Sequence, residues 1–568
     1  MILTLLVLNV CRALIVGASN VPGLGPFGHL PGLGASALLL AIWTGGRAAL
    51  RHRTAVREWL GRPWIRDHAP EIVLAVLFAV GLAMRLWAID FGRPLILHPD
   101  EPVAAGVAIQ MLKAGSLAAP VPYHYPTVYM YLVLPAFALR YVRGKSAGLW
   151  SSLDDVDLNT FEFYEVARAH SAVLGALTIV LTFMLARRMW PGRSGRWAGA
   201  AAAAFVALSF NHVKESHFAV TDAALTFFVV LAFLSILRAM QRGSAGSYAL
   251  AGFASGIACA TKYSALPIVV VLVVAHLFGG IDAVKSWRRL AAGLAGVVAG
   301  FFAGYPYALL NWPPFLEHLG WMSRFAGDSA YSPAGRFSYL VGYSMESGFG
   351  FLFTLVLGAA LLLAVHRRRP GELLAVTFIV VSLSLLAKTS HPFYPRYLLP
   401  LLPFAAVLVA HLVVEMVPRV LRTERSRRFV PACTTMLVGI LVWPTATEAV
   451  GYVKYLGLDD TRVETHDFII QRFPPGSTIV SEVPYLSLPS GYTHILTTPL
   501  QRNGADEYIR MGAAALVFSS DMDRTRGNSN AADMRRGLKE HFPLAAAFRP
   551  GRDRSVGPTI SIHVPPQQ

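Results

Sequence analysis

Charged side chains are scarce in this sequence. Asp, Glu, Lys and Arg together make up 15% of the 568 residues, whereas a typical soluble domain carries about 25%. Hydrophobic residues account for 54% of the chain, and the mean hydropathy is +0.49. These values exclude an ordinary soluble globular protein, and they predict a polytopic α-helical membrane protein.

Cysteine is almost absent too, with only Cys11, Cys259 and Cys433 in the chain. All three fall inside apolar segments and none is placed for a disulfide, so the cysteines carry no information on the redox compartment. The sequence also lacks a P-loop, and no Gly-x-Gly-x-x-Gly motif follows a strand; these are the motifs that cradle nucleotide phosphates. Nothing in the sequence therefore predicts nucleotide binding.

Positive charge, by contrast, is in excess, with a formal net charge of +17. The arginines stand in short clusters between apolar runs, which is typical of cytoplasmic loops rather than of a surface that binds nucleic acid. A spanning helix needs about 20 apolar residues, and we predict about 13 such helices. They cover 1–17, 34–50, 71–91, 166–188, 197–212, 222–238, 247–261, 264–280, 290–308, 350–366, 371–387, 397–416 and 430–447.

The basic clusters give these helices a direction, because short Lys- and Arg-rich loops stay in the cytoplasm. If the spans alternate, every cluster falls on one side, the inside; the clusters are 51–66, 187–196, 238–242, 285–289, 367–369 and 419–428. The sequence therefore predicts a multi-pass protein of the inner or plasma membrane with a cytoplasmic N-terminus. The outer face receives 92–165, 213–221, the turn at Lys262, 309–349, 388–396 and everything after about 448.

Two apolar segments allow more than one interpretation. The run 1–17 has no basic residue before Arg12, which favours an uncleaved span over a cleavable signal peptide. The run 126–142 is long enough to cross, but a crossing would put the basic cluster 187–196 outside. We therefore predict that 126–142 lies at or dips into the outer interface, flanked by interfacial tyrosines.

The tail differs in kind from the rest of the chain, because polar residues return and apolar runs shorten after about residue 448. Short strands are predicted at 478–482, 514–519, 545–548 and 559–564, and helices at 460–473 and 531–541. The sequence thus divides into extra N-terminal membrane helices with a basic loop (1–66), a transmembrane domain (67–447) and a small extracytoplasmic α/β domain (448–568).

The candidate catalytic carboxylates lie at two places on the predicted outer face, each next to an apolar span. Asp100 and Glu101 follow the span 71–91, and Asp222 opens the span 222–238. A carboxylate that faces a cavity at a membrane surface can act as a general base toward a hydroxyl or an amine. The alternative is that Asp100 and Asp222 only cap the helices that follow them, since an acidic residue is favourable at a helix N-terminus.

Cations stand on the same face, against the preference of positive charge for the cytoplasm. Lys262 lies in the turn between two apolar helices, and Lys388 and Arg396 flank His391 in the loop 388–397. Snorkelling explains a single lysine of this kind. Several cations beside two acidic positions instead indicate an anionic headgroup, because Arg suits bidentate contacts to phosphate and Lys a point contact.

The order of these motifs resembles the GT-C membrane glycosyltransferases, in particular the branch of protein O-mannosyltransferases and lipid A aminoarabinose transferases. The resemblance covers about 71–415 and rests on five segments. They are the pair Asp100-Glu101, the segment Tyr123-His124-Tyr125-Pro126, Asp222 at the start of a helix, the turn Gly256 to Tyr263, and the segment Arg396 to Pro403. The resemblance implies a polyprenyl-phosphate-linked sugar donor and inverting transfer of a hexosyl or pentosyl group on the outer face.

The resemblance also implies roles for individual residues. Asp100 would be the base that activates the acceptor, with Glu101 as its neighbour and Asp222 as the second acidic position. Lys262 and Arg396, with Lys388 as a further candidate, would contact the donor phosphate.

A divalent cation is a further implication, because His124 stands where the aminoarabinose branch has a metal-associated carboxylate; Tyr125 and His318 are candidate partners of the substrate or of this metal. No other cofactor is implied.

The main alternative from the sequence is a secondary transporter of an anionic solute, since such proteins also carry intramembrane charges and broken helices. The charges here gather at one membrane face rather than at the midplane, and no inverted repeat is visible, which favours the glycosyltransferase. A scaffold whose outer domain binds a partner would leave the outer-face charges unexplained. The sequence names neither the sugar nor the acceptor, which could be a glycan, a lipid or a protein.

Overall fold

The structure is a computed structural model of the whole chain. It describes residues 63–119, 125–278, 286–327, 335, 338–339, 342, 348–388, 394–497, 500, 504–522, 529–551 and 555–566. The predicted spans 1–17 and 34–50 lie outside these residues, as do most of the basic cluster 51–66 and His124.

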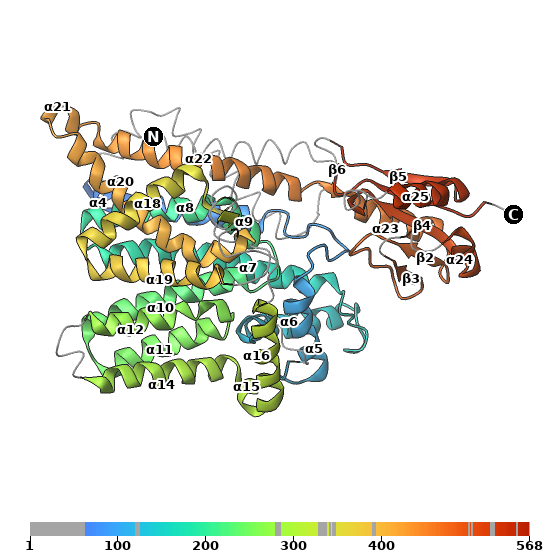
Figure 1. Cartoon of the computed structure of the whole chain (residues 1–568), viewed down its shortest axis with the longest axis horizontal. Helices are drawn as coiled ribbons and strands as arrows, with labels where there is room; N and C mark the ends of the chain where they lie inside the picture. The colour runs from blue at the N-terminus through green and yellow to red at the C-terminus, as the bar shows by residue number, and fades with distance from the viewer. Residues whose placement is uncertain are drawn as a thin grey trace.

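Apolar helices form the larger part of the molecule (Figure 1). Every predicted span within the described residues coincides with a helix. These helices are α4 (Pro63–Leu86), α7 (Phe161–Met189), α8 (Arg193–Leu208), α10 (Asp222–Arg242), α11 (Ala245–Cys259), α12 (Pro267–Leu277), α14 (Trp287–Gly304), α18 (Phe351–Arg367), α19 (Pro370–Leu386), α20 (Leu402–Val420) and α22 (Val430–Leu456).

Five helical stretches in the described residues are long and apolar enough to cross a membrane: α4, α7, α10, the stretch Pro395–Val420 that includes α20, and α22. The helix α20 is buried over most of its length and is part of the main hydrophobic cluster. The predicted class of a mainly helical protein with several membrane-type helices is confirmed.

Glycines allow two helices of the bundle to pack in close backbone contact. The helices α11 and α14 pack through Gly252 and Gly256 on one side and Gly293, Gly296 and Gly300 on the other. A Cβ atom at Gly252 would come within 1.8 Å of the Gly293 carbonyl oxygen. Small residues four apart are what allows membrane helices to approach this closely.

Several helices run across the bundle at the end that faces the C-terminal domain (Figure 1). They include α5 (Val107–Ala114), α6 (Val128–Ser146), α15 (Pro306–Leu310) and α16 (Trp312–Gly327). The helix α6 contains the run 126–142 that we predict at the interface. Its transverse course agrees with that prediction rather than with a crossing, and α6 is not one of the five spanning candidates.

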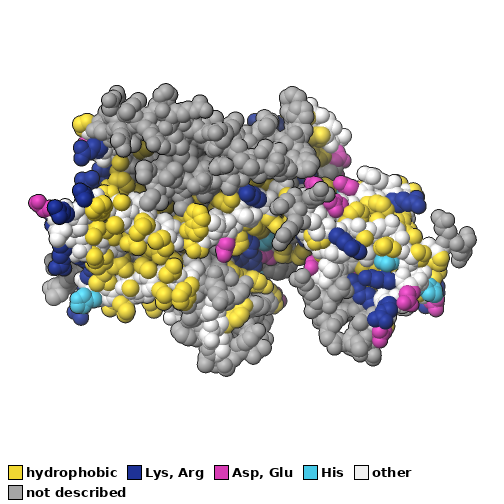
Figure 2. Space-filling view, turned by 90° about the horizontal axis from the view of Figure 1, so that it is seen from above, with side chains coloured by type: hydrophobic (Ala, Val, Ile, Leu, Met, Phe, Trp, Pro, Cys, Tyr) yellow, Lys and Arg dark blue, Asp and Glu magenta, His cyan; other side chains and the backbone are white. Residues whose placement is uncertain are grey.

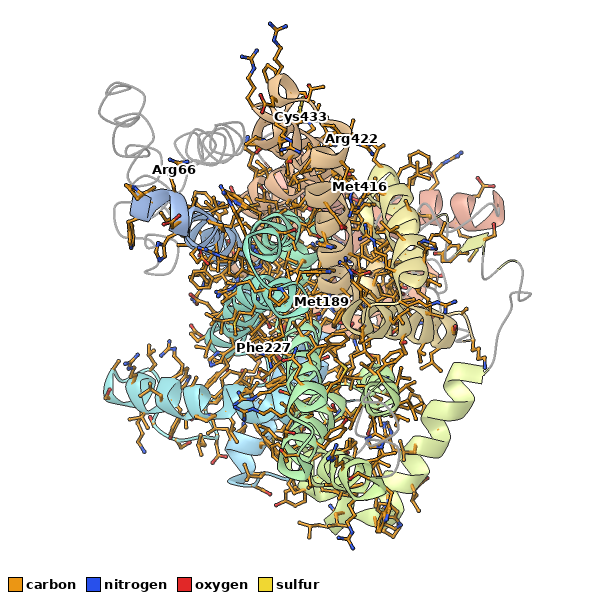
Figure 3. All side chains as sticks on the ribbon, turned by 90° about the vertical axis from the view of Figure 1, so that its left-hand side faces the viewer. Arg66, Met189, Phe227, Met416, Arg422 and Cys433 are labelled. Carbon is orange, nitrogen blue, oxygen red and sulfur yellow. The ribbon has the colours of Figure 1, made fainter. Side chains whose placement is uncertain are left out.

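Basic side chains gather at the opposite end of the bundle. Figure 2 shows Lys and Arg at this end, many hydrophobic side chains next to them on the visible face, and the C-terminal domain beyond. Figure 3 looks onto the basic end, where Arg66 on α4 and Arg422 after α20 are labelled. The short helix α21 (Glu424–Arg427) lies there too. The described parts of the clusters that we predict on one side of the membrane thus lie at one end of the bundle.

The tail folds into a separate α/β unit at the other end (Figure 1). Its five-stranded sheet has the order β3-β2-β4-β7-β5, in which β3, β2 and β4 are parallel and β7 is antiparallel to β4 and β5. The strands are β2 (Thr478–Ser481), β3 (Thr493–Leu496), β4 (Ala513–Ser519), β5 (Leu544–Phe548) and β7 (Ile560–His563). The helices are α23 (Thr461–Arg472), α24 (Ala505–Arg510) and α25 (Ser529–His541), and β1 (Asp459–Asp460) pairs with β6 (Ser555–Val556).

The loop after α4 joins this unit to the bundle. Leu95 from this loop is fully buried in the hydrophobic cluster of the C-terminal domain, together with residues of α23, β2, β4 and β7. The following residues, His98 to Glu101, return to the helical part. The segment that carries Asp100 is therefore anchored in the C-terminal domain on one side and in the helical bundle on the other.

Candidate active site

Asp100 lies in a tight turn directly before a short π-helix, η1 (Pro102–Gly106), which leads into α5. The backbone N–H of Asp100 donates to Nδ1 of His98 at 3.2 Å. The His98 ring stacks on Phe218 with 4.1 Å between the ring centroids. This turn fixes the direction in which the Asp100 side chain leaves the backbone.

The Asp100 carboxylate pairs with Arg396, with 2.7 Å between Oδ2 and the guanidinium NH1. Arg396 is on η4 (Pro395–Leu401), the helical turn before α20. The Asn211 amide holds this turn in place by donating to the Pro395 carbonyl oxygen at 2.7 Å. Asp100 is not the N-cap residue of η1, which is Glu101, whereas Asp222 does lie in the first turn of α10.

A second ion pair joins Asp222, the first residue of α10, to Lys262 in the turn after α11. The Lys262 ammonium lies 2.9 Å from Oδ1 of Asp222, and both side chains are largely buried. Burial alone would lower the pKa of Lys262, but the Asp222 carboxylate outweighs it and holds the pKa above its ordinary value. Lys262 is thus a permanent cation at neutral pH.

Aromatic rings connect the two ion pairs. Tyr397 lies 5.8 Å from the Lys262 ammonium and 5.8 Å from the Arg396 guanidinium, measured to the ring centroid. Tyr125 contacts Lys262 in the same way at 5.3 Å. The structure therefore brings Asp100, Asp222, Lys262, Arg396 and Tyr125 into one site, although their positions span almost 300 residues of sequence.

Glu101 takes a different direction from its neighbour. Both oxygens of its carboxylate bind the Arg168 guanidinium, at 2.7 and 2.8 Å, and Oε1 also accepts from the Ala219 backbone N–H at 2.9 Å. The side chains of Glu101 and Arg168 are completely buried. Arg168 donates further to the Ile89 and Phe91 carbonyl oxygens. Glu101 thus ties α7 and the loop before α10 to the Asp100 turn.

A further carboxylate lies close to the site and was not among the candidates from the sequence. Glu215 ends the short helix α9 (Phe210–Glu215) and is buried, 3.5 Å from the Lys214 ammonium. Burial raises the pKa of Glu215, and the charges of Asp222 and Arg396 are near enough to act on it. The only sequence signal was its place in the polar segment 211–217 between two apolar runs.

The chain is similar in sequence to known membrane transferases. Residues 133–296 match the family described as dolichyl-phosphate-mannose-protein mannosyltransferase. An undecaprenyl phosphate-alpha-4-amino-4-deoxy-L-arabinose arabinosyl transferase of Pseudomonas fluorescens is 27% identical over 365 residues, which cover 59% of this chain and 60% of that protein. The transferase of the same name from Pseudomonas aeruginosa is 26% identical over 334 residues, which cover 56% and 55%.

The solved structures agree in fold. ArnT from Cupriavidus metallidurans in the apo state superposes with a TM-score of 0.55 at 16% identity, covering 90% of this chain and 98% of that one. The apo oligosaccharyltransferase of Archaeoglobus fulgidus gives 0.52 at 12% identity, covering 85% and 74%. The predicted resemblance to the GT-C glycosyltransferases is confirmed. The matched segments span about 60% of the length of the arabinosyl transferases.

The family match covers only part of the site. Its range, 133–296, runs from α6 to α14 and includes Asp222 and Lys262. Asp100 and Arg396 lie on either side of it, and the three-dimensional structure rather than this match brings them to the Asp222–Lys262 pair.

The remaining candidates are placed as follows. Lys388 lies exposed in the turn after α19. His318 is buried on α16, and its ring stacks over Trp321 with 5.8 Å between centroids. His124 lies outside the described residues. Among the residues that the structure describes, no three His, Cys, Asp or Glu side chains form a cluster that could hold a metal ion, and the metal site at His124 stays a prediction.

Proposed function

We propose that this protein is a membrane glycosyltransferase that moves a sugar from a polyprenyl-phosphate-linked donor to an acceptor on the extracytoplasmic face. The observation that carries the proposal is the pairing of two carboxylates, Asp100 and Asp222, with two cations, Arg396 and Lys262, at one site. A transferase of this kind needs a base for the acceptor and positive charge for the departing phosphate. The similarity to named lipid-linked sugar transferases supports the same function.

In the proposed reaction, Asp100 takes the proton from an acceptor hydroxyl or amine. The acceptor atom then bonds to the anomeric carbon while the bond between that carbon and the phosphate oxygen breaks, which inverts the configuration. The electron pair of this bond leaves with the lipid phosphate. Arg396 and Lys262 stabilise the charge that develops on the phosphate, which is the kind of electrostatic stabilisation that contributes most to many enzymes.

The Asp100–Arg396 ion pair would link donor binding to the base. The structure holds the Asp100 carboxylate 2.7 Å from Arg396. A lipid phosphate that draws Arg396 to itself would release the Asp100 carboxylate. The released carboxylate could then contact the acceptor and take its proton, so donor binding would make the base available. Glu101 would hold the turn in place rather than take part in proton transfer, because both of its oxygens already bind Arg168.

The test is donor consumption by the purified protein, measured as release of polyprenyl monophosphate from a panel of polyprenyl-phosphate sugars. Arg396→Ala and Lys262→Ala are each expected to reduce consumption of the accepted donor by about 10²-fold, because removing one stabilising group at developing charge typically costs that much.

Arg419→Ala serves as the matched control. Arg419 also belongs to an ion pair, with Glu415 at 2.7 Å, but it is half exposed and lies in the basic cluster at the other end of the bundle. Its replacement should leave consumption near the native rate. Equal losses in all three variants, or no consumption of any donor, would refute the phosphate site.

The transporter alternative finds no support in the comparisons. We further propose that the chain has about 13 spans, a cytoplasmic N-terminus and an extracytoplasmic C-terminal domain. Among the described residues, the basic clusters gather at the end of the bundle opposite this domain (Figure 2), which supports that orientation.

Cysteine labelling tests the orientation. In a variant without native cysteines, Ser490→Cys in the exposed loop before β3 should react with a membrane-impermeant maleimide on whole cells. Arg425→Cys on α21 should react only after the cells are opened. The reverse pattern would place the site on the cytoplasmic face and refute the assignment of Asp100 to an outer reaction.

A further inference from the structure

A cavity of about 200 Å³ lies beside the Asp100 turn and is distinct from the ion pairs. Its walls come from five parts of the chain: the loop after α4, the end of α9 with the segment that follows it, the end of α22, the first residues of the C-terminal domain, and β6. It is thus built where the helical bundle meets the α/β unit. No residue assigned above to proton transfer or to the donor phosphate lines it.

Aromatic rings form much of the wall. Phe91 and Phe218 meet edge to face with 5.8 Å between centroids. Tyr452 and Tyr455 approach from the end of α22, and Tyr455 is partly exposed. Rings of this kind offer flat apolar faces beside polar edges.

Polar groups stand between the rings. The Tyr452 hydroxyl is buried, and it has no hydrogen-bond partner within the described part of the chain. A buried polar atom without a partner is uncommon and costs free energy, so a ligand that satisfies it would be favoured. Lys214 and Arg462 also line the cavity, and Asp460 holds Arg462 at 2.7 and 2.8 Å.

The charges that line the cavity are balanced. Asp460 neutralises Arg462, and Lys214 lies 3.5 Å from Glu215. Burial keeps the pKa of His98 below its ordinary value, so its imidazole is neutral at neutral pH. A phosphate or carboxylate would find no surplus cation here, whereas a neutral, hydroxyl-rich ligand would find both donors and acceptors.

The cavity is linked directly to the proposed base. His98 lines it, and Nδ1 of the same ring accepts the Asp100 backbone N–H. A group bound in the cavity therefore lies next to the turn that carries Asp100. The volume is below the roughly 300–1,000 Å³ of pockets for drug-sized ligands, which fits one small ring rather than a lipid chain or a folded partner.

We propose that this cavity binds one neutral sugar unit of the acceptor, so that the acceptor of the transfer is a glycan. This inference rests on the proposed function in naming the bound sugar as the acceptor. The aromatic rings would pack against the apolar C–H faces of the sugar, and Tyr452, Lys214 and the Asp460–Arg462 pair would bind its hydroxyls. The C-terminal domain would then contribute to acceptor selection through Asp460 and Arg462.

Saccharide binding to the full-length protein tests this without any donor. The probes are methyl glycosides of glucose, mannose, galactose and N-acetylglucosamine, followed by saturation-transfer NMR in nanodiscs, which avoids detergents with sugar headgroups. At least one glycoside should bind. Leu458→Trp, which fills the cavity, should weaken binding at least tenfold, and Leu496→Trp, at an exposed position on β3, should not change it.

Tyr452→Phe provides a second variant that removes only the hydroxyl. It should weaken binding about three- to tenfold, as expected for the loss of one hydrogen bond. The inference is overturned if no glycoside binds, or if Leu458→Trp and Tyr452→Phe, both folded, bind as well as Leu496→Trp.

The donor assay separates this result from the proposed function. Consumption of donor without saccharide binding would refute the sugar subsite alone. Saccharide binding that depends on Tyr452, in a protein that consumes no donor, would refute the transferase and leave a sugar-binding cavity.

Discussion

Glu101→Gln is expected to lower the stability of the protein by about 3–5 kcal/mol and to reduce its yield sharply. The variant removes the charge that compensates Arg168, whose side chain is completely buried. Breaking a buried ion pair from one side typically has a cost of this size, because the remaining charge stays in a medium of low polarity. The Gln side chain keeps the size of Glu and still offers an oxygen to the Ala219 N–H. The loss of stability therefore measures the effect of the missing charge rather than a change in packing.

Thermal unfolding of the purified protein measures this effect. Arg93→Ala is the control from the same region, since Arg93 and Glu165 form a pair at 2.9 Å that is partly exposed. Its loss should change stability by less than about 1 kcal/mol. The double variant Glu101→Leu with Arg168→Met should recover part of the loss, because replacing both partners by apolar residues removes the uncompensated charge. Native-like unfolding of Glu101→Gln would show that the pair does not stabilise the Asp100 turn.

Much of the helical part was predictable because apolar runs leave few alternatives to a helix in a membrane. The span predicted at 222–238 is α10, which begins at the same residue and continues to Arg242. The last span was predicted to end at 447, but α22 continues to Leu456. Its final turns include Glu448 and Lys454, which end the apolar run without ending the helix. Hydropathy therefore found the helix but not the arm that reaches the C-terminal domain.

In the C-terminal domain, strands with a clear local apolar pattern could be predicted from the sequence, whereas a strand defined by its pairing with a neighbour could not. The predicted segments 478–482, 514–519, 545–548 and 559–564 correspond to β2, β4, β5 and β7. The strand β3 (Thr493–Leu496) escaped prediction because none of its four side chains is fully buried and it has no alternating apolar pattern, so that its pairing with β2 defines it. The strand order depends on contacts between distant segments and carries no local signal.

At the site, the sequence indicated which residues share a face but not which pairs they form. Asp100, Asp222, Lys262 and Arg396 were expected together from their order and sidedness, and the structure resolves them into two ion pairs. The separate direction of Glu101 was not predicted. An arginine inside the predicted span 166–188 was the available signal, because a charge within a membrane helix usually has a partner. That arginine is Arg168.

Asp100 as the general base is the central claim of this account. Asp100→Asn keeps the size of the side chain and removes its ability to take a proton. It also removes the negative partner of Arg396, which leaves that cation available to the donor phosphate. Donor affinity should therefore be unchanged or higher, while turnover falls by about 10²–10⁴-fold, the usual contribution of a general base. A structural role for Asp100 would instead lower stability without this separation of binding from turnover.

The most direct measurement is the single-turnover rate of Asp100→Asn with saturating donor, together with its donor affinity and unfolding temperature. Asp467→Asn, at an exposed position on α23, is the matched control and should retain native values for all three. We predict that Asp100→Asn unfolds near the native temperature, binds donor at least as tightly as the native protein, and transfers the sugar about 10²–10⁴ times more slowly. Transfer at a near-native rate would contradict the assignment and leave Asp222 as the candidate base.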